Sequence, residues 1–336
     1  MSNINKYECM DETIVDRVPS GEDDLTTALQ RIKWPSPIYP WVRARQLEGT
    51  WPGDKKTGAC VSTVMRVQKG WGSITEDIWP DDGKAWPIIE PPGLDLKAKA
   101  CRIGAYQRVN TVEECREVIS NHGLVQASFA IDDTWKNAPN GVIPPPGNRP
   151  ITVNHSIVLI GMSTRKRRFV FLNTWGPGWG RRGWGFLPYS YFPSRFIEGW
   201  MVTVPESESW EPSVFPRIKL FQWYTQSPFG DLYCSEIVDT LRDEILAWGI
   251  AIEREDSLDL EELFVRPGWR RQGCGSLLAT EFAQLAADLD KRLRAWVPHP
   301  DGVKGNEEAL NKILLRMGLV RRPSPVRWAA AVGESP

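Results

Sequence analysis

Two strand-like segments of this 336-residue chain carry side chains that together can activate a thiol. His155 opens the apolar run HSIVLIG, and Asn173 ends the next apolar run, FVFLN. If the two runs form a hairpin, the imidazole and the amide lie side by side. An imidazole can accept the proton of a cysteine, and an amide oxygen can fix the tautomer and orientation of that imidazole. A lone histidine at a strand start is usually structural, so the flanking residues decide the interpretation.

The residues that follow Asn173 form a distinctive tryptophan- and glycine-rich run. The segment NTWGPGWGRRGWGF resembles the Asn-Ser-Trp-Gly-x-x-Trp-Gly-x-x-Gly-Tyr run of the papain family of cysteine peptidases, and Asn154-His155 resembles that family's Asn-His pair. A weaker similarity extends back through WGSITEDIWP, so the resemblance covers about residues 36–204. It implies that His155 and Asn173 are catalytic, that Trp175 shields their hydrogen bond, and that the substrate is a peptide or protein.

The nucleophile that this resemblance implies is Cys9. Its separation from His155 lies within the roughly 130–150 residues typical of these enzymes. Asn3 then stands where the family has a glutamine whose amide stabilises the oxyanion. A second alignment places the helix that begins near Asp24 in the central position, with Asp24 at the place of the nucleophile. That alignment describes an inactive, peptide-binding relative of the peptidases.

A second group of residues lies in the segment LEELFVRPGWRRQGCGS, which ends at Ser276. A strand leads into a short basic turn, and the turn opens a long helix. Free N–H groups at a helix N-terminus bind phosphate, helped by the helix dipole. Gly273 and Gly275 allow close approach of the backbone. The absence of a Gly-Lys-Ser/Thr ending excludes a P-loop.

The pattern Arg270-x-x-Gly273-x-Gly275 resembles the cofactor motif of the GNAT superfamily of N-acetyltransferases. Asn306-x-x-Ala309 and a later Gly318 resemble further motifs of that superfamily, and the similarity covers about residues 234–330. It implies acetyl-CoA as co-substrate and no metal. The implied cofactor-binding residues are Leu263, Phe264 and Val265 for the pantetheine arm, Arg270, Arg271, Gln272, Gly273, Cys274, Gly275 and Ser276 for the pyrophosphate, and Asn306.

The second segment departs from the GNAT pattern in two ways. Leu314 stands where the family often has a tyrosine that protonates the thiolate of CoA. The chain also lacks room for the first two helices of that fold, so the peptidase domain is a candidate wall of the acceptor site. Glu261 or Glu262 can act as a base through a water molecule or occupy an exposed structural position. His299 is a further candidate group.

The elements that position these residues follow from the periodicity of apolar side chains. Thr111 and Glu114 form a capping-box pattern at the start of one helix. The expected helices are Asp23 to Trp34, Ser36 to Glu48, Ala59 to Lys69, Val112 to Asn121, Ser276 to Arg294 and Asn306 to Met317. The expected strands are Leu124 to Ile131, Ser156 to Met162, Phe169 to Asn173, Trp200 to Val204, Ser235 to Leu241, Glu244 to Glu253, Leu258 to Val265 and Ala295 to Pro298.

A helical half followed by a β half is an α+β arrangement. We therefore expect a papain-like two-lobe domain, with a helical lobe and a β lobe, in residues 1–204. An acidic, proline-flanked linker follows at 205–216. A GNAT-like α/β domain with a mixed, mostly antiparallel sheet is expected at 217–336.

Composition narrows the possible partners. The net charge of −1 argues against nucleic acid or a membrane surface as a partner. Six scattered cysteines without a CxxC pair fit a reducing cytoplasm. Residues 36–49 look like bacterial members of the papain family. We expect a bifunctional cytoplasmic enzyme of bacterial type. The alternatives are a pseudo-peptidase that presents a peptide to the acetyltransferase, and a protein whose two domains only bind ligands.

Overall fold

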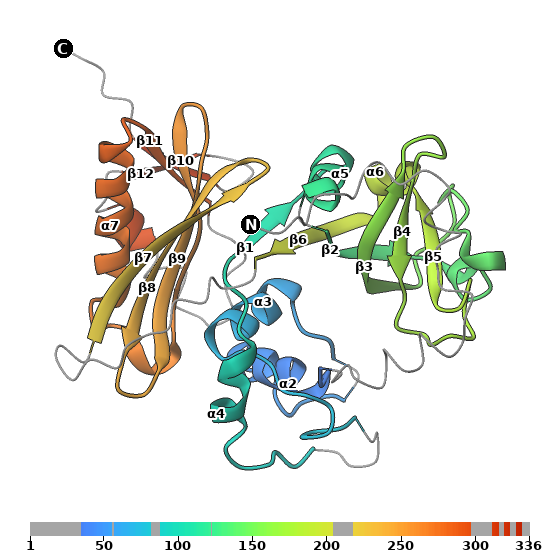
Figure 1. Ribbon diagram of the computed structural model, residues 1–336, viewed down its shortest axis with the longest axis horizontal. Coiled ribbons are helices and arrows are strands. Elements are labelled where there is room, and N and C mark those ends of the chain that lie inside the picture. Colours follow the sequence, from blue (N-terminus) through green and yellow to red (C-terminus); the bar gives the residue numbers. More distant parts are fainter. Residues whose placement is uncertain are drawn as a thin grey trace, which may run out of the picture. The chain divides into compact units, whose positions relative to one another are not determined.

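The computed structural model describes residues 35–55, 57–81, 88–121, 123–203, 218–296, 311–315, 319–322 and 327–330. They divide into two compact units (Figure 1). One unit contains residues 106–202. The other joins residues 33–105 to residues 203–336, so its two halves are separated in the sequence by the first unit.

The first unit is built on a six-stranded antiparallel sheet with the order β1-β6-β2-β3-β4-β5. The strands are β1 (Tyr106–Val109), β2 (Val125–Ile131), β3 (Val153–Ser163), β4 (Arg168–Leu172), β5 (Trp184–Pro188) and β6 (Phe196–Val202). The strands expected from periodicity correspond to β2, β3, β4 and β6. Strands β1 and β5 were not predicted, because they are short and contain few alternating apolar residues.

Helix α5 (Val112–Asn121) begins at the residue that the capping pattern predicted. The Thr111 hydroxyl accepts a hydrogen bond from the Glu114 amide at 3.0 Å, and the Glu114 carboxylate accepts one from the Thr111 amide at 3.2 Å. These two bonds satisfy amides that have no partner inside the helix, which confirms the predicted capping box. The buried face of α5 contains Cys115, Val118 and Ile119.

The second unit has helices on the two faces of one sheet. Helices α2 (Ile38–Leu47), α3 (Val61–Gly70) and α4 (Leu94–Ala98) come from its N-terminal half, and α7 (Cys274–Asp288) comes from its C-terminal half. The sheet has the order β12-β13-β11-β10-β9-β8-β7. Its strands are β7 (Ile218–Ser227), β8 (Gly230–Asp239), β9 (Glu244–Glu253), β10 (Ser257–Val265), β11 (Arg292–Trp296), β12 (Leu319–Arg322) and β13 (Arg327–Ala330).

This sheet is mixed and mostly antiparallel, as the sequence predicts, because β10 and β11 form its one parallel pair among the described strands. Strand β9 is buried along nearly its whole length. Gly249 lies under the ring of Phe282 from α7, and Trp248 lies against Gly70 of α3. A strand that is covered on both faces has apolar residues at consecutive positions, which explains why the sequence of β9 is almost entirely apolar.

Several elements of the second unit differ from the expected ones. Helix α7 ends at Asp288, before the predicted Arg294, and Asp290 adopts a left-handed φ of 53°. Lys291 then donates from its backbone to Ala286, and β11 starts immediately afterwards. Strand β7 was missed although its side chains alternate between more and less exposed positions. Of the expected last helix, residues 311–315 are described and are helical.

The packing joins the helices of residues 33–105 to the C-terminal sheet, whereas the family resemblance groups them with the N-terminal domain. The expected linker at 205–216 lies outside the described residues, and the domain boundaries therefore stay a prediction. Within the described residues, no helix is long and apolar enough to cross a membrane.

Candidate functional site

The hairpin of β3 and β4 brings His155 and Asn173 into contact. His155 lies near the start of β3, and Asn173 follows the last residue of β4. The two strands pair antiparallel from Val158 and Leu172 onward, which leaves both side chains at the same end of the hairpin. The imidazole Nε2 and the amide Oδ1 are 2.8 Å apart. The structure thus brings together the two side chains that the sequence analysis singled out.

The neighbouring amide of Thr174 fixes the direction of this hydrogen bond. The backbone N–H of Thr174 donates to the same Oδ1 of Asn173 at 2.8 Å. Since a backbone N–H can only donate, the atom it faces must be the amide oxygen. The imidazole therefore donates from Nε2, and in its neutral form His155 carries its lone pair on Nδ1. That tautomer can accept a proton from a thiol.

Two indole rings enclose the imidazole. Trp175 stacks on His155 with ring centroids 4.8 Å apart and an interplanar angle of 28°. Trp135 meets the imidazole edge-on, at 6.1 Å and 85°. Burial lowers the pKa of His155 from its ordinary value, and the hydrogen bond to Asn173 only partly opposes that effect. Neutral imidazole, the form that acts as a base, is thus favoured near neutral pH.

The loop between β4 and β5 holds the indoles in place. Its glycines permit tight turns: Gly180 has a φ of +59°, and a Cβ there would lie 2.5 Å from the Trp184 carbonyl oxygen. The loop is closed by the backbone N–H of Asn173, which donates to the Gly183 carbonyl at 2.9 Å. Trp179 donates from Nε1 to the Trp135 carbonyl at 2.6 Å. The loop is therefore tied to the segment that follows β2.

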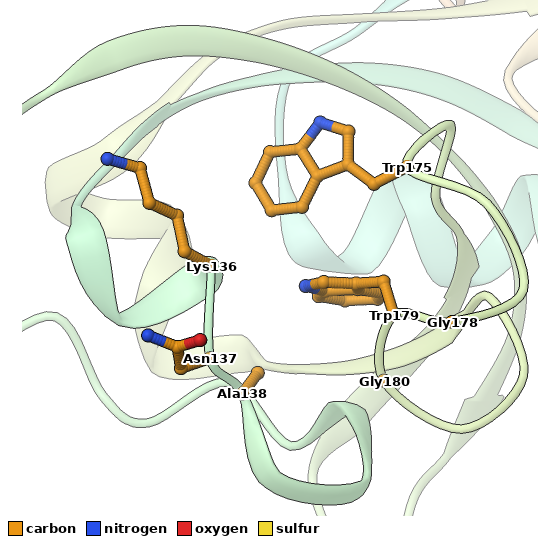
Figure 2. A pocket seen from close by; sticks show the side chains of 7 residues that line it. All are labelled: Lys136, Asn137, Ala138, Trp175, Gly178, Trp179 and Gly180. Carbon is orange, nitrogen blue, oxygen red and sulfur yellow. The ribbon is translucent and has the colours of Figure 1, made fainter.

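A hollow of about 660 Å³ opens beside this loop. Figure 2 shows the rings of Trp175 and Trp179 on one side of it and the side chain of Lys136 on the other. Sequence reasoning pointed to the tryptophan run but missed the lining residues from the other wall, because nothing in their local sequence marks them. The complete lining is Lys136, Asn137, Ala138, Trp175, Gly178, Trp179 and Gly180.

The expected cofactor turn of the second unit leads from β10 into α7. Arg271 and Gly273 both have left-handed backbones, with φ values of 62° and 88°. Arg270 donates from Nε to the Val265 carbonyl at 3.1 Å, which holds the turn against the end of β10. The thiol of Cys274 is partly buried, and burial raises its pKa. The first turn of α7 thus follows a tight, basic turn.

The three strand residues expected beside the pantetheine arm lie at the end of β10. Leu263 and Val265 pack with the core under α7. Phe264 is buried and faces α3, where it lies 4.6 Å from the ring of Trp248. Phe264 is therefore enclosed by side chains on that face of the sheet.

Glu262 is neither exposed nor free to act as a base. Its carboxylate is buried and receives two bonds from Arg66 of α3, at 3.1 and 3.3 Å. A second buried pair joins Lys69 of α3 to Glu236 of β8 at 2.6 Å. The expectation of an exposed or water-linked Glu262 is therefore wrong. The reason is tertiary, because the charged face of α3 covers this part of the sheet.

Of the other residues that the sequence singled out, the structure describes Leu314 and most of the cysteines. Leu314 is buried in the core under α7, so this position supplies no proton donor. Among the described cysteines, Cys60 and Cys101 are exposed, Cys274 is partly buried, and Cys115 and Cys234 are buried. Asn3, Cys9, Asp24, His299 and Asn306 lie outside the described residues.

Comparison with known proteins supports the first of the two expected components. Residues 94–189 match the papain family cysteine protease model. An uncharacterized peptidase C1-like protein of Acanthamoeba polyphaga mimivirus is 22% identical over 200 residues, which is 53% of this chain and 63% of the relative. The match thus spans less than two thirds of that relative. Residues 94–189 thus resemble the papain family of cysteine peptidases, which supports a papain-like α+β fold with an antiparallel sheet.

Solved structures give lower similarities. Xylellain, a cysteine protease from Xylella fastidiosa, is 19% identical with a TM-score of 0.46, over 54% of this chain and 74% of its own. Digestive procathepsin L 3 of Tenebrio molitor is 13% identical with a TM-score of 0.41, over 55% and 60%. A Klebsiella pneumoniae protein described as an acyl-CoA N-acyltransferase is 18% identical with a TM-score of 0.25, over 30% and 71%.

Proposed function

We propose that this chain is a bifunctional enzyme, a thiol peptidase whose base is His155 and an acetyl-CoA-dependent N-acetyltransferase acting on peptide or protein amines. The observation that supports the peptidase most directly is the hydrogen bond from His155 Nε2 to Asn173 Oδ1 beneath Trp175. It holds the imidazole in the tautomer whose Nδ1 can accept the proton of a thiol.

In this proposal Cys9 supplies the thiol. Its proton passes to Nδ1 of His155, and the resulting thiolate attacks the carbonyl carbon of the peptide bond. Asn3 donates to the oxyanion that forms. The imidazolium then gives its proton to the leaving amine as the C–N bond breaks, which leaves the acyl group on Cys9 as a thioester. A water molecule that gives a proton to Nδ1 of His155 hydrolyses this thioester, releases the carboxylic acid and restores the thiol, and Asn173 keeps the ring oriented through these transfers. The hollow lined by Trp175 and Trp179 would receive a neighbouring substrate residue, and its indole walls favour an apolar side chain.

The peptidase is tested by cysteine labelling of the full chain with iodoacetamide at near-neutral pH, mapped by mass spectrometry. Cys60 and Cys101 are exposed and give background labelling, so both are first replaced by serine. We expect Cys9 to react far faster than the remaining thiols, because a thiolate is the reactive form. The rate should collapse in His155→Ala.

Slow labelling of Cys9 that does not depend on His155 would reject the peptidase. The alternative is then a pseudo-peptidase that binds a peptide and presents it to the second domain. A peptide library screened for binding by fluorescence anisotropy separates that alternative from a chain that binds no peptide. In a pseudo-peptidase, bound peptides remain intact on prolonged incubation.

The acetyltransferase is supported by the turn between β10 and α7. A helix N-terminus preceded by Arg270 and Arg271 offers amides and positive charge to a pyrophosphate. The turn follows Val265 at the end of β10, beyond the residues Ser257 to Leu260 that pair with the parallel neighbour β11. Because Glu262 is paired with Arg66, its carboxylate is not available as the base. We propose that residues 33–105, whose helix α3 packs on the sheet, form one wall of the acceptor site in place of the missing helices.

Isothermal titration of CoA into the full chain tests this second activity. Arg270→Ala with Arg271→Ala should weaken binding. The matched control is Arg292→Ala with Arg294→Ala on β11, two arginines that pair with Asp256 at the surface. Acetyl transfer is followed as thiol release from acetyl-CoA with a peptide amine as acceptor. Unchanged CoA affinity in the turn variant, or no CoA binding in the wild type, would reject this part of the proposal.

A further inference from the structure

A buried carboxylate lies just after β2 and is surrounded by donors. Asp132 is 2% exposed. It accepts from the Thr134 amide at 3.0 Å and from Arg149 Nε at 3.2 Å. Burial works to raise the pKa of Asp132, but the hydrogen bonds from Thr134 and Arg149 together hold it below its ordinary value. The group is therefore a fixed negative charge in the interior of the first unit.

Tyr191 connects this charge to Trp135. The indole N–H of Trp135 donates to the Tyr191 hydroxyl oxygen at 2.8 Å. An indole nitrogen can only donate, so the hydroxyl proton of Tyr191 is directed elsewhere. It points to Asp132 Oδ2, which lies 3.3 Å away. The chain of hydrogen bonds therefore has one direction, from Trp135 through Tyr191 to Asp132, and each polar atom in it has a partner.

Trp135 in turn contacts the site by two routes. Its ring is fully buried and meets the His155 imidazole edge-on at 6.1 Å. Its backbone carbonyl accepts from Trp179, whose ring stands at 90° to Trp175 with centroids 5.6 Å apart. Trp175 in turn stacks on the imidazole of His155. Both routes begin at Trp135 and end at the same imidazole.

We propose that Asp132, Tyr191 and Trp135 are positioning residues for His155, an inference that rests on the proposed peptidase activity. The fixed carboxylate orients the Tyr191 hydroxyl, the hydroxyl fixes the Trp135 indole, and the indole sets both the position of the imidazole and its shielding from water. Removal of the Tyr191 hydroxyl leaves a buried indole N–H without its acceptor. Trp135 then shifts, the imidazole gains water contact, and the pKa of His155 rises toward its ordinary value.

Tyr191→Phe tests this network in the full chain. Two quantities are measured: the pKa of His155, from NMR titration of labelled imidazoles assigned with His155→Gln, and the pH profile of kcat/KM on a fluorogenic peptide. We expect the acidic limb of the profile to move to higher pH together with the NMR pKa. We also expect kcat/KM to fall by about tenfold or more, because small displacements of a catalytic group are costly. Asp132→Asn, which keeps one acceptor oxygen, should show a smaller effect than Asp132→Ala.

The matched control is Tyr189→Phe. Tyr189 belongs to the same turn, and its buried ring packs on Phe169 at 4.7 Å. This variant should leave the pKa of His155 and the pH profile unchanged. If Tyr191→Phe lowers the melting temperature but moves neither the pKa nor the profile, the network is only structural and the proposal is overturned. Since the NMR titration needs no turnover, it decides this question even if the wild type cleaves no peptide.

Discussion

Arg66 of α3 and Glu262 of β10 form a buried two-point ion pair across 196 residues of sequence. Their side chains are 6% and 4% exposed. Arg66 also lies over the ring of Phe264, at 5.5 Å. The same helix contributes Lys69, which bonds both Glu236 and the Gly104 carbonyl. These contacts attach an N-terminal helix to the C-terminal sheet and occupy a carboxylate that sequence alone offered as a catalytic base.

Replacement of one partner in this pair should be strongly destabilising. In Glu262→Leu the Arg66 guanidinium stays buried without the carboxylate that faces it, which costs about 3–5 kcal/mol of unfolding free energy. The double variant with Arg66→Leu should recover much of that loss, because both charges are gone. Urea denaturation, monitored by tryptophan fluorescence, measures the unfolding free energies of the wild type, the two single variants and the double variant. Asp256→Asn, in an exposed pair with Arg292, should change stability far less, because solvent screens a surface ion pair. Equal losses in the single and double variants would contradict the coupling.

The stacked ring of Trp175 should control the basicity of His155. Trp175→Ala removes the cover from one face of the imidazole, and renewed hydration should raise the pKa of His155 toward its ordinary value. Trp175→Phe keeps an aromatic cover and should move it less. NMR titration of the imidazole measures both variants. Since Trp175 is itself 39% exposed, the folded structure should survive the change. A pKa that falls in Trp175→Ala would show that hydration is not the cause.

The lowered pKa of His155 has a consequence for stability against pH. The unfolded chain binds a proton at His155 at a higher pH than the folded chain does. Stability from this group is therefore fully present above about pH 6.5 and declines as the pH falls below it toward the folded pKa. In His155→Gln this part of the dependence should disappear. Unfolding free energies measured at several pH values for both proteins check it, and an identical pH slope would contradict the prediction.

The turn before α7 should depend on glycine at position 273. Its φ of +88° is unfavourable for any residue with a Cβ, although nothing lies within 4 Å of an added methyl group. Gly273→Ala should therefore destabilise the turn by about 1 kcal/mol through strain alone and weaken CoA binding. Gly268→Ala, where the surroundings are equally open and the backbone is not left-handed, is the control. Titration calorimetry measures both, and equal CoA affinities for the two variants would count against a role for the turn.

Local signals fixed several elements correctly. Helix α5 was predictable to the residue because Thr111 and Glu114 satisfy each other's amides within one turn of chain. The contact of His155 with Asn173 was predictable because a hairpin joins two neighbouring apolar runs. Strand β7 was not predicted, although the exposure of its side chains alternates. Helix α7 was predicted to be too long, because the helical spacing of apolar residues continues past Asp290, whose left-handed backbone follows the end of the helix.

The sequence by itself determined the α+β pattern, the imidazole–amide pair and the basic turn before α7, because each depends on residues close together along the chain. Only the tertiary structure decided that Arg66 neutralises Glu262 and that α3 covers the C-terminal sheet. It also decided that Trp135 links His155 to the buried Asp132. These contacts join residues far apart in sequence, or depend on which face of an element a side chain occupies. Burial and charge pairing arise only when the chain packs, so no local pattern records them.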